Sequence, residues 1–106
     1  MISQDQFIHH VYFWLKDPAD PASHSRLLEG IRSLGAITAI DSYHIGVPAG
    51  TNREVIETTY AFSWLAVFDS KEAQDAYQVD PIHLQFVADC SILWEKVVVY
   101  DSVGAY

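Results

Sequence analysis

The chain has 106 residues, of which 50% are hydrophobic and 13% aromatic, and it carries a formal net charge of -8. This length fits a single domain spanning residues 1–106, and a chain so rich in apolar residues is not expected to be intrinsically disordered. The six Lys and Arg residues form no cluster, which argues against binding to nucleic acid or to an anionic membrane surface.

Residues 1–7 contain no basic segment followed by a long apolar run, so we predict no signal peptide. No stretch approaches the roughly 18 consecutive apolar residues of a membrane-spanning helix, and we expect a cytoplasmic protein. Residues 7–16 are rich in aromatic and β-branched side chains, which predicts a strand. Asp20 and Pro21 then suit the N-cap and the first residue of a helix, and Gly35 suits its end.

Two further strands are predicted over residues 37–47 and 58–68, with a loop between them at residues 48–57. Asp69 or Ser70 is expected to cap the helix that follows the second of these strands.

That helix is interrupted at Asp80-Pro81, where Asp80 is expected to cap a second helical segment over residues 81–93. This segment contains the one cysteine of the chain, Cys90, which cannot form an internal disulfide and is expected to be buried as a small apolar side chain. A short strand over residues 96–100 completes the chain.

The predicted order is therefore β-α-β-β-α-β, with the second helix broken in two. This order is typical of an α+β, ferredoxin-like subunit, in which helices cover one face of an antiparallel sheet.

The strands carry apolar residues on both faces, although a sheet with one solvated face should alternate apolar and polar residues. In the first strand Val11, Phe13 and Leu15 alternate with Tyr12 and Trp14. The third strand is expected to place one set of residues on one face and a second apolar set on the other. The first set is Tyr60, Phe62, Trp64 and Phe68, and the second is Ala61, Leu65 and Val67. Since the helices cover only one face, we predict a homodimer that buries the other face against a second copy.

Three polar side chains lie in apolar surroundings: His10, Tyr77 and His83. His9 and His10 point to opposite faces of the first strand, so at most one of them enters a pocket between sheet and helices. His83 falls in the first turn of the helix that begins at Pro81. The positive end of the helix dipole disfavours a charged imidazole there, and a neutral imidazole suits a general base. Alternatively, His83 bonds a neighbouring carbonyl and Tyr77 simply packs.

Trp14, Trp64 and Trp94 are either core residues or the lining of a pocket for a flat ligand. No phosphate-binding loop, dinucleotide-binding glycine motif, nucleophile elbow or zinc-binding motif is present. We therefore expect no cofactor and no metal site.

Three segments of the sequence resemble the stress-responsive A/B barrel (Dabb) family. They are the opening strand His10-Val11-Tyr12-Phe13-Trp14-Leu15-Lys16, the segment from Ala66 to Ser70 with the motif Tyr77-Gln78-Val79-Asp80-Pro81-Ile82-His83, and the closing strand from Trp94 to Asp101. The resemblance covers nearly the whole chain. It implies a ferredoxin-like subunit that dimerises through its sheet into an α/β barrel.

The same resemblance implies a site. A plant polyketide cyclase of the family has a catalytic tyrosine and histidine that match Tyr77 and His83, and a first-strand histidine that matches His10. Its pocket-lining positions correspond to Tyr12, Trp14, Phe62, Trp64 and Trp94. This chain departs from that cyclase by having Asp80 in place of a histidine and by bulkier residues at several pocket positions.

Three functions follow from these observations. The first is a small-molecule binder or cofactor-independent enzyme, a lyase, cyclase or isomerase in which His83 is the base, Tyr77 stabilises an enolate oxygen and His10 assists. The second is a noncatalytic stress or structural homodimer. The third is a cofactor-free monooxygenase, since small dimeric α/β barrels of related shape oxidise aromatic substrates.

Overall fold

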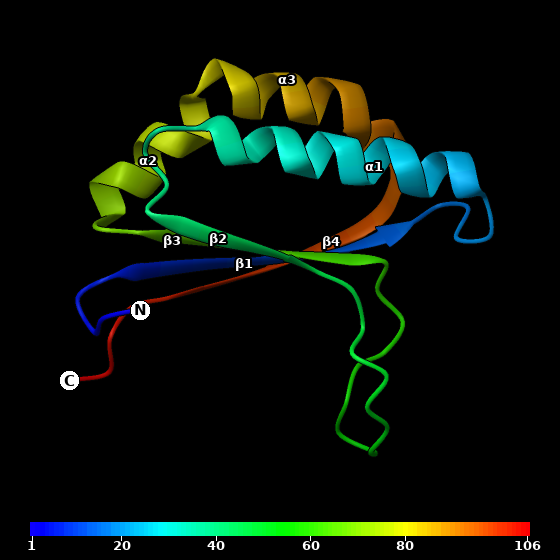
Figure 1. Cartoon of the computed structure of the whole chain (residues 1–106), viewed down its shortest axis with the longest axis horizontal. Coiled ribbons are helices and arrows are strands. Elements are labelled where there is room, and N and C mark those ends of the chain that lie inside the picture. The colour runs from blue at the N-terminus through cyan, green and yellow to red at the C-terminus, as the bar shows by residue number, and fades with distance from the viewer.

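Four strands form one antiparallel sheet in the order β2-β3-β1-β4, and the helices all lie on one of its faces (Figure 1). The computed structural model describes residues 1–106. Its elements are β1 (Phe7–Leu15), α1 (Pro21–Ser33), β2 (Ser42–Gly46), β3 (Phe62–Phe68), α2 (Lys71–Val79), α3 (Pro81–Cys90) and β4 (Trp94–Ser102). Short 3-10 turns, Leu34–Ala36 and Ser91–Leu93, follow α1 and α3. The ferredoxin-like order with a divided second helix is confirmed.

Side-chain caps fix where the helices begin. The Asp20 carboxylate accepts a hydrogen bond from the backbone N–H of Ala22 at 3.1 Å, immediately before Pro21. Ser70, rather than Asp69, caps α2. Asp80 accepts from the N–H of Ile82 at 2.8 Å and so starts α3 directly after α2 ends. Each cap satisfies a backbone donor that the first helical turn leaves free.

Two strands are shorter than the sequence suggests. The strand predicted over residues 37–47 begins only at Ser42, because Ile37 is buried in the core and the chain turns there, with the N–H of Ile40 bonded to the carbonyl of Ile37. The strand predicted over residues 58–68 begins at Phe62, where its pairing with Phe13 of β1 begins. Tyr60 was expected on the same face as Trp64, and this was wrong, because Tyr60 lies before the strand and packs against Tyr12 on the opposite face.

The hydrophobic core lies between the sheet and the helices. Val11, Phe13 and Leu15 enter it from β1, and Leu27 and Ile31 enter it from α1. Cys90 is buried in this core, as predicted. A Cβ atom at Gly30 of α1 would clash with the Cys90 sulfur, so glycine allows α1 and α3 to approach closely at this point.

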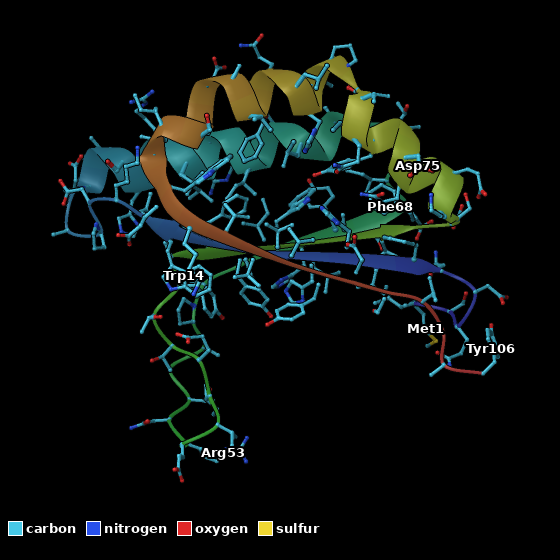
Figure 2. All side chains as sticks on the ribbon, turned by 180° about the vertical axis from the view of Figure 1, so that it is seen from behind. Met1, Trp14, Arg53, Phe68, Asp75 and Tyr106 are labelled. Carbon is cyan, nitrogen blue, oxygen red and sulfur yellow. The ribbon has the colours of Figure 1, made fainter.

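The second face of the sheet carries no helix. His10, Tyr12 and Trp14 lie on it and are only half-buried. The loop of residues 47–61, which joins β2 to β3, projects away from the sheet on this side, opposite the helices (Figures 1 and 2). Arg53 lies at its far end (Figure 2). None of the helices has both the length and the apolar character needed to cross a membrane.

Candidate functional site

A cavity of about 150 Å³ lies between the sheet and the helices, and ten of its thirteen lining residues are hydrophobic. Its polar groups are the side chains of His9, Gln78 and His83 together with the hydroxyl of Tyr77. They come from β1, the end of α2 and the start of α3. The break between α2 and α3 at Asp80-Pro81 therefore brings Tyr77 and His83 into one space.

Tyr77 is the buried centre of this group, with 1% of its surface exposed. Its hydroxyl accepts a hydrogen bond from the indole Nε1 of Trp64 at 3.1 Å. Burial raises the pKa of Tyr77 to about 12, against the smaller opposing effect of the Trp64 bond. The phenol is therefore neutral at pH 7, and its own proton is free to be donated to a bound molecule.

His83 lies beside Tyr77, with their ring centroids 4.7 Å apart. Its Nδ1 is 3.1 Å from the backbone carbonyl oxygen of Gln78. Since a carbonyl only accepts, Nδ1 carries the proton and Nε2 of the neutral ring is left as an acceptor. Burial lowers the pKa of His83, which the bond to Gln78 only partly offsets. At pH 7 the ring is neutral and suited to take up a proton.

His9 also packs against Tyr77, with ring centroids 5.6 Å apart. It is buried, and its Nδ1 donates to a carboxylate oxygen of Asp101 at 2.7 Å. Asp101 lies directly opposite His9 in the β1–β4 pairing, so the sheet register sets this contact. The carboxylate fixes the ring orientation and leaves Nε2 without a hydrogen-bond partner in the structure.

The cavity thus combines one neutral hydroxyl donor with two imidazoles whose Nδ1 atoms are already bonded. No group of three His, Cys, Asp or Glu side chains converges here or elsewhere in the chain. Such a set of groups can take a proton from a bound molecule and hydrogen-bond an oxygen that gains negative charge.

Comparison with protein families gives a match over residues 7–103 to the stress responsive A/B barrel domain, Dabb. The chain belongs to the Dabb family. A search of curated protein sequences finds no match.

Solved structures with this fold include a Dabb family protein from Mesorhizobium loti, 23% identical, with a TM-score of 0.78 over 95% of this chain and 98% of that one. A hydroxynitrile lyase from Passiflora edulis is 16% identical, with a TM-score of 0.77 over 97% of this chain and 96% of that one. A dimeric ferredoxin-like protein of unknown function from Thermobifida fusca is 21% identical, with a TM-score of 0.75 over 92% and 90%. At these identities the similarity establishes the fold.

The Dabb fold brings together four of the eight site residues that the sequence suggested. Tyr77, His83, Trp64 and Trp94 line the cavity. Phe62 is buried on the same side of the sheet but outside the lining, where its ring contacts His24.

Tyr12 and Trp14 lie on the opposite face, where they line a separate hollow of about 390 Å³. His10 is on that face too, with its ring 4.5 Å from that of Tyr12, so the fold does not bring His10 to Tyr77 and His83. His9 takes the place expected for His10. Strand alternation gave only part of the signal: it puts His9 on the same face as Val11, Phe13 and Leu15, but it does not say which face lies under the helices.

Changing Tyr77 to phenylalanine is expected to destabilise the Dabb fold by about 1–3 kcal/mol, because the fully buried Trp64 indole N–H would lose its acceptor. Thermal and urea unfolding would measure this loss. Tyr43→Phe is the matched control, since the Tyr43 ring stacks near Trp64 but its hydroxyl accepts no bond from it. Equal stabilities of Tyr77→Phe and the wild type would show that the Trp64–Tyr77 bond contributes nothing.

Proposed function

We propose that this Dabb protein is a cofactor-independent enzyme that binds a small, mostly apolar carbonyl compound and moves a proton next to the carbonyl group. The observation that carries this proposal is the neutral phenol of Tyr77, whose ring packs against those of both His9 and His83 in an apolar cavity. The same fold in a hydroxynitrile lyase supports a lyase-type reaction.

In this proposal Nε2 of His83 takes the proton from the carbon next to the carbonyl. The Tyr77 hydroxyl donates a hydrogen bond to the carbonyl oxygen and stabilises the enolate that forms, and the Trp64 N–H strengthens this donor by bonding its oxygen. The protonated His83 then returns its proton to the enolate, while His9, held in place by Asp101, hydrogen-bonds the substrate. Bond cleavage, aldol closure or isomerisation then depends on the substrate.

The cavity size limits the substrate. A volume of 150 Å³ corresponds to about five water molecules at roughly 30 Å³ each. This is smaller than the ~300–1,000 Å³ of sites for drug-sized ligands. A short aldehyde or ketone fits this space better than a long polyketide chain.

The test is the exchange of α-protons for deuterium in a panel of small ketones dissolved in D2O, followed by proton NMR. The rate is expected to stay constant from alkaline pH down to below 6.5, and to fall only as pH drops through the lowered pKa of His83, because the base must be unprotonated. No alkaline decline is expected near neutrality, since the pKa of Tyr77 is about 12. A rate that rises on acidification would contradict a neutral histidine base.

We also propose that the protein is a homodimer joined through the open face of the sheet. Four aromatic side chains, Tyr12, Trp14, Tyr60 and Tyr100, gather on this face around the 390 Å³ hollow. An aromatic surface that no helix covers favours contact with a second copy, and the Thermobifida fusca protein of the same fold is dimeric. If no substrate is turned over, this dimer itself, as a noncatalytic stress protein, is the alternative function.

A further inference from the structure

The loop of residues 47–61, here called the arm, contains no helix or strand and is bonded to its own sheet through its base, at Thr59 and Ala61. It is roughly 15 residues long, and loops of this length without secondary structure usually carry a function. None of its residues is buried, and Val55 is 88% exposed. An exposed valine near the end of a projecting loop is more stable when a second surface covers it.

The base of the arm is fixed to the sheet. The Trp14 indole donates to the Thr59 hydroxyl at 2.8 Å, and the backbone N–H of Thr59 donates to the Glu57 carboxylate at 2.8 Å. Next to Thr59, the N–H of Ala61 donates to the carbonyl of Phe13 at 2.8 Å. These bonds direct the arm away from the helices, as Figure 2 shows.

The reach of the arm exceeds the thickness of a sheet-to-sheet contact. The subunit extends 37 Å along the vertical direction of Figure 1, and one layer of helices on a sheet fills roughly half of that length. Two sheets pack about 10 Å apart. With about seven residues in each limb, at up to roughly 3.3 Å per residue, the arm is long enough to pass the sheet of a second copy and reach the level of its helices.

In the proposed dimer the two-fold axis is taken to run parallel to the strands, and this axis decides which edge of the second copy the arm meets. The sheet has two free edges, β2 and β4, and closing two four-stranded sheets into a barrel removes both of them. A two-fold axis parallel to the strands places the β2 edge of one copy beside the β4 edge of the other. Because the arm follows β2 directly, it emerges beside the partner's β4.

The catalytic cavity opens at that same edge. Its exposed lining residues are Gln78, Val87 of α3 and Val99 of β4, so the opening lies between α3 and the edge strand. We propose that the arm of each copy lies across the mouth of the other copy's cavity, with Val55 against the apolar residues Val87 and Val99. This inference rests on the proposed dimer, and it makes each cavity complete only when the second copy is present.

Cross-linking tests the contact without any substrate. Val55→Cys and Val87→Cys subunits, carrying different tags, are co-expressed and treated with a short bismaleimide. The mixed dimer is expected to cross-link, while a mixed dimer of Val55→Cys and Glu29→Cys is not, because Glu29 lies exposed on α1. Any cross-linking through the native, buried Cys90 is measured on the wild-type protein and subtracted as background.

A second measurement guards against an unreactive cysteine pair. Replacing residues 49–56 by Gly-Ser-Gly keeps Thr59 and its bonds, and it is expected to speed maleimide labelling of Val87→Cys several-fold in the dimer. Absence of both the cross-link and the faster labelling in a protein that sediments as a dimer would overturn the arm contact alone. Sedimentation as a monomer would overturn the proposed dimer as well. The proposed proton-transfer activity is tested separately, by the exchange of α-protons in small ketones.

Discussion

Replacing His83 by alanine is expected to lower the rate of α-proton exchange in small ketones by about 10²–10⁴-fold, the usual contribution of a general base. The side chain lies in the first turn of α3, half-buried and facing the cavity, and its loss leaves the Asp80 cap that begins the helix intact. The fold is therefore expected to remain, and thermal unfolding of the variant would verify this. The exchange rate, followed by proton NMR at pH 7, gives the effect directly.

His24→Ala is the matched control for this experiment. His24 is on α1, and its Nε2 bonds the carbonyl of Pro18 rather than facing the cavity. Its exchange rate should equal that of the wild type. A folded His83→Ala variant with an unchanged rate would exclude His83 as the base and leave His9, oriented by Asp101, as the group to test next.

The order of the elements could be predicted from the sequence because its signals are local. Asp20-Pro21 and Asp80-Pro81 mark helix starts within a few residues, and both act as expected in the structure. The same local signal placed His83 in the first turn of a helix and next to Tyr77. These two residues line one cavity because a single capping residue separates α2 from α3.

A local sequence pattern could not decide whether His9 or His10 enters the cavity. Alternation shows that they face opposite ways, but which face lies under the helices depends on how β1 pairs with distant strands. The pairing of Val11 with Trp64 and of His9 with Asp101 fixes that face. Asp101, which orients His9, is separated from it by most of the chain, so no spacing rule in the sequence pointed to this contact.

The open face of the sheet gives the second large expected effect. Tyr12 lies at its centre, half-buried, with ring centroids 4.9 Å from Tyr60 and 6.3 Å from Tyr100. In a dimer joined through this face, Tyr12→Glu would bury a carboxylate in each subunit beside the neutral His10 ring, with no cationic partner from His10, which costs several kcal/mol. The dimer dissociation constant is expected to rise at least about 100-fold, since each 1.4 kcal/mol changes it tenfold.

Sedimentation velocity over a range of micromolar concentrations would measure this rise. Tyr106→Glu is the matched control, because Tyr106 is 88% exposed near the C-terminus and away from the hollow on the open face. Tyr106→Glu should sediment as the wild type does, and Tyr12→Glu as a folded monomer with a lower unfolding temperature, because it loses the stabilisation that the dimer gives. A Tyr12→Glu protein that dimerises as tightly as the control would move the interface to another surface, since a charge at the centre of a buried aromatic face cannot be neutral in its effect.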